Sequence, residues 1–199
     1  APKRVLSRWA DADLERYRRT IQQAIASNPS RGIGPYQVAT ALRDVFPRER
    51  WTHVGRDPAL ESLDILYRNG VRYLVITGGE PTLHPHLAEI AKHGQGLGMK
   101  MMLVTNGSLL KPKRVRHLVD SGISSFIISI DAANREAHEA NRGLPGVCER
   151  IRAANALLRE LRVHTTASVT MSRLLDYDAL PGFLESLGFD SVTFSYPVT

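Results

Sequence analysis

Hydrophobic and polar positions alternate along most of the chain in blocks that predict strands and helices in turn. Runs rich in β-branched and aromatic residues are followed by segments with apolar residues at helical spacing. The pattern predicts strands at about 71–77, 99–105, 125–130, 163–169 and 191–196, and helices at about 57–69, 83–93, 112–119, 147–161 and 179–187. Because one helix separates each pair of strands, we expect a parallel sheet with right-handed crossovers.

The spacing of the strands leaves two architectures open. A doubly wound sheet and an open or closed βα barrel both repeat a strand and a helix at this interval. Residues 11–27 and 36–46 also have helical spacing, whereas the polar stretch 47–56 fits neither pattern. We therefore expect a helical extension over residues 1–50 and an α/β core over residues 51–199.

The segment VRYLVITGGEPTLHP, residues 71–85, combines a buried strand with an unusual end. Gly78 and Gly79 leave the backbone bare, so that a ligand can approach its carbonyl and N–H groups. The carboxylate of Glu80 can take a cationic group, and Pro81 ends the strand because it lacks an N–H. These residues predict a site for a ligand with an ammonium group, although Gly-Gly-x-Pro also forms ordinary turns.

Polar residues follow the other predicted strands in the same way. Parallel βα folds place their ligand sites at the carboxyl ends of the strands. Asp131 can accept two ribose hydroxyls, Asn106 and Ser129 can bind a polar ligand, and Arg142 can clamp a carboxylate. Taken alone, each of these residues is better explained as a helix cap or a loop hydrogen bond, but their shared position at consecutive strand ends predicts one common site.

Composition restricts the class of protein without naming a function. The chain has 199 residues, 43% of them hydrophobic, which is enough for one folded core. No apolar run reaches the ~18 residues of a membrane span, and no secretion signal opens the chain. The single cysteine, Cys148, excludes an internal disulfide and favours a reducing compartment, so we expect a cytoplasmic protein.

The formal net charge of +6 permits an anionic partner, but the basic residues are dispersed. The densest group, Lys111 to Arg116, lies on a predicted helix. We interpret it as a solvated helix face, with a nucleic-acid patch as the alternative. We therefore do not expect nucleic acid to be a partner.

Four segments together resemble the radical S-adenosylmethionine superfamily. They are TGGEPTLHP, VTNGSLL, ISIDAANREAHEANRG and SVTMS, in this order. The resemblance covers about residues 57–199 and implies a partial (β/α)6 barrel. It implies that Gly78, Gly79 and Glu80 bind the methionine amino group of S-adenosylmethionine and that Ser129 and Arg142 face its carboxylate. It places Asp131 near the ribose, Asn106 on the cavity floor, and Val169 and Tyr196 beside the adenine.

The resemblance further implies an enzyme of oxidoreductase or transferase type. Such enzymes cleave S-adenosylmethionine reductively at a [4Fe–4S] cluster and start radical chemistry on a substrate. The implied partners are a small-molecule or peptide substrate and an electron donor protein. The substrate itself is not indicated by any segment of the chain.

One departure from the family pattern concerns the cluster. The family holds it on three cysteines in a CxxxCxxC loop, whereas this sequence has only Cys148, on the predicted helix 147–161. We assign no residue as a metal ligand and expect Cys148 to be a small buried hydrophobe. Three explanations remain open: a loop missing between about Phe46 and Asp57, which we expect as a chain break; a truncated chain; or a degenerate, non-catalytic binding module.

A third reading is an unrelated βα barrel that binds a phosphorylated ligand. It would need a glycine-rich loop that opens a helix and cradles the phosphate. The glycines of Gly94 to Gly98 instead fit a helix end before a strand, which argues against this reading.

Overall fold

The computed structural model describes residue 19, residues 56–171 and residues 175–195. The described elements follow one another along the chain as α3 (Arg56–Arg68), β1 (Tyr73–Ile76), η2 (Pro81–Leu83), α4 (Leu87–Gly96), β2 (Lys100–Thr105), α5 (Pro112–Asp120), β3 (Ile123–Ile130), α6 (Arg135–Arg142), α7 (Val147–Glu160), β4 (His164–Thr170), α8 (Leu180–Ser186) and β5 (Ser191–Ser195).

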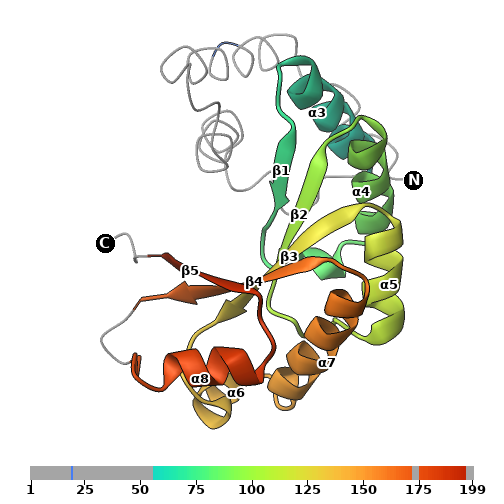
Figure 1. Ribbon diagram of the computed structural model, residues 1–199. Coiled ribbons are helices and arrows are strands. Elements are labelled where there is room, and N and C mark those ends of the chain that lie inside the picture. Colours follow the sequence, from blue (N-terminus) through green and yellow to red (C-terminus); the bar gives the residue numbers. More distant parts are fainter. Residues whose placement is uncertain (1–18, 20–55, 172–174, 196–199) are drawn as a thin grey trace, which may run out of the picture.

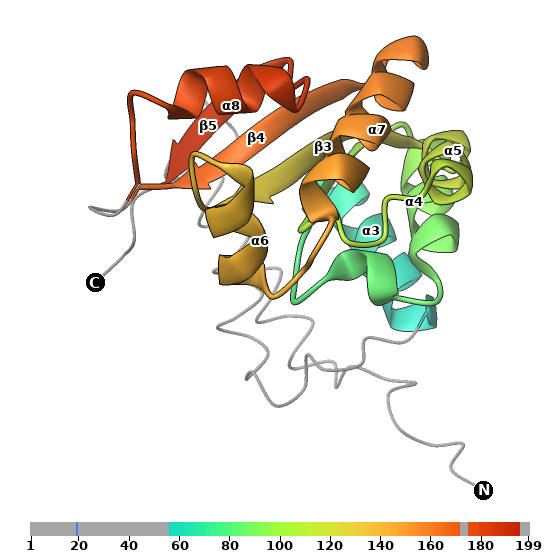
Figure 2. The same cartoon turned by 90° about the horizontal axis from the view of Figure 1, so that it is seen from below.

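The five strands form one parallel sheet in the order β1-β2-β3-β4-β5. This confirms the prediction that consecutive strands are neighbours in a single sheet. A doubly wound sheet reverses its strand order at a switch point, whereas this sheet never does. With right-handed crossovers, unbroken order places the helices on one face, and Figures 1 and 2 show α7 and α8 on the same side of the sheet. The architecture is therefore an α/β partial barrel.

The core lies between the sheet and its helices. Alternate strand residues are fully buried on this side, among them Met101, Leu103, Phe126, Ile128 and Ala167. Their neighbours along each strand point to the other, concave face and are mostly half-buried or exposed. The concave face carries Met102 and Val104 on β2, whereas hydroxyl side chains predominate on β4 and β5. One side of each strand thus holds the fold together and the other is available to a ligand.

Two local predictions were wrong in detail. The helix expected over residues 83–93 is a 3-10 turn, η2, followed by α4 from Leu87. His84 is extended, with ψ at 125°, because a residue that precedes proline is disfavoured in the α region. Helix α6 was not expected at all. Asn134 caps its start by accepting a hydrogen bond from Ala137 N at 2.9 Å, and Gly143 ends it at φ +61°.

Several predictions concern residues outside the described part of the structure. They include the helices at 11–27 and 36–46, the extension over residues 1–50 and Tyr196. The chain break expected between Phe46 and Asp57 also falls almost wholly there. These remain predictions from the sequence.

Gly107, in the turn after β2, gives a sharp test of this packing. Its φ is +80°, and an added Cβ would lie 2.7 Å from Ile151 Cγ1 on α7. We expect Gly107→Ala to lower the free energy of unfolding by about 2–4 kcal/mol through strain and overpacking, measured by urea denaturation. Gly96→Ala is the control, because its Cβ meets no atom within 4 Å. Equal stability of the two variants would contradict this packing.

Candidate functional site

The carboxylate of Glu80 joins the ends of β1 and β2. Its Oε1 accepts hydrogen bonds from Thr82 N at 3.1 Å and from Thr105 Oγ1 at 2.7 Å, and the Thr82 hydroxyl also donates to it. Its Oε2 accepts from Asn106 N at 2.8 Å. Four donors on one charged group fix two loops that lie 25 residues apart in sequence. Glu80 therefore has a structural role in anchoring the two loops, and one further lone pair on its Oε2 is left for a ligand cation.

The backbone beside this anchor is open, as the sequence predicted. Gly78 and Gly79 are exposed, and a Cβ at either position would meet no atom within 4 Å. Gly78 also has a φ of +156°, which residues with a side chain rarely adopt. Bare carbonyl groups next to a fixed carboxylate are suited to an ammonium group.

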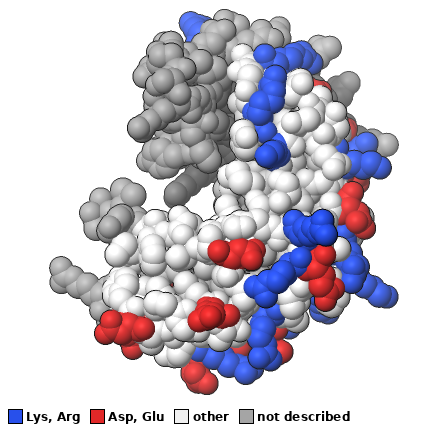
Figure 3. All heavy atoms as spheres, in the orientation of Figure 1, with Lys and Arg blue, Asp and Glu red and all other residues white. Residues whose placement is uncertain are grey.

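Helix α5 supports the same loop from behind. The guanidinium of Arg114 donates a hydrogen bond to the carbonyl oxygen of Thr82, which is fully buried. Lys111, Lys113 and Arg116 on the same segment are exposed. Figure 3 shows basic and acidic side chains mixed along the helical side. The basic stretch therefore consists of a solvated helix face and one arginine with a structural role.

Asp131, immediately after β3, forms a two-pronged ion pair with Arg142 at the end of α6. Arg142 donates from Nη2 to Asp131 Oδ1 at 2.6 Å, and its Nε lies against Oδ2. The sequence suggested separate roles for these residues, with Arg142 as a clamp for a carboxylate and Asp131 as an acceptor for ribose hydroxyls. The structure brings them together, so that Arg142 orients the carboxylate of Asp131. Both side chains remain about a third exposed, which leaves the outer lone pairs of the carboxylate open to a ligand.

His138, one turn before Arg142 on α6, contacts the backbone of the same aspartate. Asp131 N donates to His138 Nδ1 at 3.2 Å, and the ring is fully buried. Burial lowers the pKa of His138, because desolvation disfavours the imidazolium; the nearby Arg142 lowers it further, while Asp131 and Glu139 oppose the shift. The ring is therefore neutral at pH 7.

The remaining predicted residues lie at the same edge but differ in what they offer. Ser129 on the concave face of β3 lies in register with Ser168 of β4. Asn106 Oδ1 accepts from Ser108 N at 2.8 Å, so its side chain holds the turn after β2. Val169 is fully buried among core residues, which leaves only its backbone for a ligand.

Three residues that contribute to this edge were not singled out as site residues from the sequence. Thr82 and Thr105 satisfy Glu80, and His138 holds Asp131. The signal for Thr105 was its place directly before Asn-Gly at a strand end. The signal for His138 was its spacing of four residues from Arg142, which puts both on one helix face.

Cys148 lies in the first turn of α7, where its N donates to Glu139 of α6, and it is 3% exposed, as expected for a small buried hydrophobe. Burial, and the adjacent Glu139 carboxylate after it, raise the pKa of its thiol to about 11. Among the described residues, no three of His, Cys, Asp or Glu are grouped to hold a metal ion. A three-thiolate [4Fe–4S] cluster does not fit the single, protonated thiol of this sequence.

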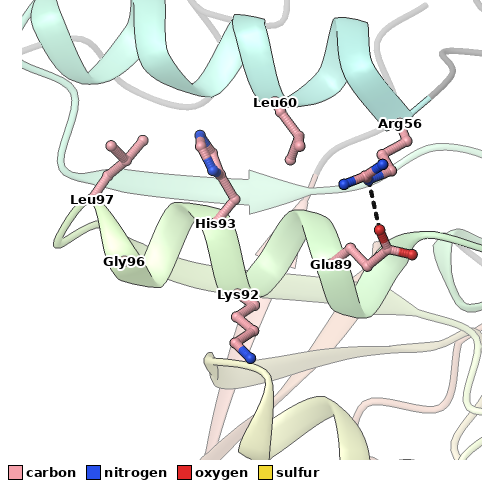
Figure 4. Close-up of a pocket in the computed structure, with 7 residues that line it drawn as sticks. All are labelled: Arg56, Leu60, Glu89, Lys92, His93, Gly96 and Leu97. Carbon is pink, nitrogen blue, oxygen red and sulfur yellow. Dashed lines mark ion pairs between the residues drawn. The ribbon is translucent and has the colours of Figure 1, made fainter.

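A shallow groove lies elsewhere, between α3 and α4 on the outer, helical side. Figure 4 shows Arg56 and His93 directed into it, with Arg56 paired to Glu89. The Arg56–Glu89 pair is 2.6 Å long, and His93 Nε2 lies 2.8 Å from Asp64 Oδ1. These side chains satisfy one another across the two helices, so the groove marks the packing of α3 against α4 and is not the candidate site.

Replacing Glu80 by glutamine tests the anchor. The new amide NH2 would face N–H and hydroxyl donors, so we expect Glu80→Gln to lower the free energy of unfolding by about 1–3 kcal/mol. Urea denaturation at neutral pH measures this, with Glu61→Gln on the exposed surface of α3 as the control. If the two variants are equally stable, Glu80 does not anchor the loops.

The thiol of Cys148 should be inert in the folded protein. With a pKa of about 11, about one thiol in a thousand is ionised at pH 8, and the group is also buried. We expect a disulfide reagent to label it slowly in buffer and within seconds in urea. Rapid labelling of the native protein would contradict the buried placement.

Comparison with known proteins identifies the family of the chain. The family model described as the Radical SAM superfamily matches residues 46–180. An AdoMet-dependent heme synthase of Methanosarcina barkeri (strain Fusaro / DSM 804) is 38% identical over 116 residues, which cover 56% of this chain and 33% of that protein. A PqqA peptide cyclase of Rhizobium meliloti (strain 1021) is 27% identical over 134 residues, covering 67% and 34%.

The fold is also found among solved structures. Streptococcus suis SuiB bound to S-adenosylmethionine superposes with a TM-score of 0.54 at 18% identity, covering 69% of this chain and 32% of that one. The chain spans about a third of the length of these curated relatives. None of the described helices is long and apolar enough to cross a membrane. Because the family model matches most of this chain, we conclude that the chain belongs to the Radical SAM superfamily.

Proposed function

We propose that this chain binds S-adenosylmethionine at the carboxyl edge of its sheet, as part of an enzyme that cleaves this cofactor reductively. The observation that carries the proposal is the pair of fixed carboxylates at this edge. Glu80 is held beside the exposed Gly78–Gly79 backbone, and Asp131 is held by Arg142 with one side open. An ammonium group and a ribose diol are the ligand groups that this arrangement suits.

Each residue has a proposed role in holding the cofactor. The carbonyl groups around Gly78 and Gly79 accept from the methionine ammonium, with Glu80 supplying the compensating charge. Asp131, whose carboxylate Arg142 orients, accepts hydrogen bonds from the ribose hydroxyls. The backbone at Val169 borders the adenine. Ser129 and Asn106 contribute polar groups to the wall and floor, and Tyr196 stays assigned to the adenine side from the sequence resemblance.

S-adenosylmethionine, when bound and reduced in such enzymes, supplies a 5′-deoxyadenosyl radical that removes a substrate hydrogen. Reduction requires a [4Fe–4S] cluster, which the one thiol of this sequence does not hold. We therefore assign to these residues the binding and orientation of the cofactor, and no step of electron transfer.

For the substrate, the names of the relatives suggest two classes. One relative is a heme synthase and another a peptide cyclase, so a tetrapyrrole or a peptide is the proposed substrate class. An electron donor protein is the proposed partner, and the cytoplasm the proposed location.

A second candidate function is a binding module without redox chemistry. The observation that favours it is the burial of Cys148, the one cysteine in the sequence. Such a module would keep the nucleoside site at the sheet edge but perform no cleavage.

Calorimetry with S-adenosylhomocysteine tests the proposed site without any cluster. We expect saturable binding with one site per chain, weakened by about 1–3 kcal/mol in Asp131→Ala because the ribose loses a charged acceptor. Asp178→Ala removes an exposed carboxylate from a turn and serves as the control. Absence of binding by the wild-type protein, or equal binding by the two variants, would contradict the proposed site.

Anaerobic treatment with iron and sulfide separates the two candidate functions. We expect this 199-residue chain to bind S-adenosylhomocysteine yet to assemble no stoichiometric cluster, since it has one thiol. The same treatment of the protein encoded by the full gene then decides between the enzyme and the binding module. A product with a CxxxCxxC loop that turns brown and cleaves S-adenosylmethionine supports the enzyme, whereas one without iron or cleavage supports the binding module.

A further inference from the structure

His138 has no role in the proposed contacts with the cofactor, yet it is the most deeply buried ionisable side chain near the site. Its ring is 0% exposed, although histidine is usually found at intermediate burial. The ring is packed on α6 behind Asp131, and the groups that act on it electrostatically are Asp131, Arg142 and Glu139. A buried polar ring with an unsatisfied nitrogen calls for a reason.

The hydrogen bond to Asp131 fixes the protonation state of the ring. Asp131 N donates to Nδ1 at 3.2 Å, so Nδ1 must be a lone-pair acceptor and the proton of the neutral ring sits on Nε2. Nε2 itself is buried without a hydrogen-bond partner in the described part of the structure. Such an orphaned donor is unfavourable, and an aliphatic residue would avoid this cost. The only hydrogen bond that the ring makes there is the one to Asp131.

Helix α6 therefore holds Asp131 at two points from one face. His138 and Arg142 are four residues apart, so their side chains project from the same side of the helix. His138 accepts a hydrogen bond from the backbone N–H of Asp131, and the guanidinium of Arg142 contacts both carboxylate oxygens of Asp131. With its peptide and its side chain both fixed, the carboxylate has little freedom to rotate.

We propose that His138 is a positioning residue that accepts the Asp131 N–H through Nδ1 and thereby sets the direction of the Asp131 carboxylate toward the ribose diol of a bound nucleoside. This inference rests on the proposed nucleoside site. It concerns a residue that touches no ligand and acts only through Asp131. Preorganising an acceptor in this way raises affinity because less freedom is lost on binding.

Three substitutions separate positioning from packing. In His138→Asn the amide oxygen occupies the place of Nδ1, so the Asp131 N–H keeps an acceptor while much of the ring volume is lost. His138→Gln keeps more of the volume but moves the amide to the place of Nε2. His138→Leu is apolar and removes the acceptor. His117→Leu, at an exposed position of α5, is the matched control for loss of a histidine.

The measurements are the dissociation constant of S-adenosylhomocysteine by calorimetry, exchange of the Asp131 amide with deuterium, and the melting temperature. We expect His138→Leu and His138→Gln to bind about tenfold more weakly, which corresponds to about 1.4 kcal/mol. Their Asp131 amide should exchange faster. His138→Asn and His117→Leu should bind within about threefold of the wild type and keep that amide protected.

A role in packing alone predicts the opposite order, with glutamine tolerated better than asparagine in melting temperature and in binding alike. That order, or wild-type affinity in His138→Leu, would overturn the inference. If His138→Leu does not fold, the comparison of asparagine with glutamine still decides. A failure of the proposed nucleoside site would instead be seen in the wild-type protein itself, which would then not bind the probe.

Discussion

The carboxylate of Glu80 is the interaction on which the candidate site depends. A single charged group near the sheet edge accepts hydrogen bonds from Thr82, Thr105 and Asn106 and so joins the loops after β1 and β2. A half-buried carboxylate is stable there only because these donors replace its hydration. Without it, the exposed glycines beside it would be a flexible turn, since glycine restricts its own backbone least of all residues.

Asp131, after β3, is also a fixed carboxylate, but different groups hold it. There the carboxylate is held by a guanidinium and its peptide by an imidazole, both from α6. At about a third exposure, this ion pair is screened by water and adds little to overall stability. Its value lies in orientation, because a two-pronged arginine fixes the plane of a carboxylate as well as its position. Both acidic groups of the site are thus set before a ligand arrives.

The sequence allowed most of the sheet to be predicted, because its strands are long β-branched or apolar runs separated by helical periodicity. It also placed Gly78, Glu80, Asn106 and Asp131 at strand ends, where the structure has them. It did not reveal α6, whose residues are almost all polar and show no apolar stripe. Nor did it show that Asp131 and Arg142 pair with each other, since a contact across a loop and a helix leaves no periodic trace. The choice between barrel and doubly wound sheet needed the strand order itself.

The unbroken strand order has a consequence for how the chain acquires its structure. Every strand pairs with the strand that precedes or follows it in the sequence, so the sheet can grow outward one βα unit at a time. Each pairing still spans a whole helix and is slow to form, as in other parallel sheets, but the order suits a chain that emerges gradually from the ribosome. The last strand to be added has an uncovered apolar face: on β5, Val192 and Phe194 lie in register with the buried Ala167 and Val169 but are 42% and 47% exposed. Strands of this kind pair readily with other chains, so self-association during synthesis is the hazard that this topology carries.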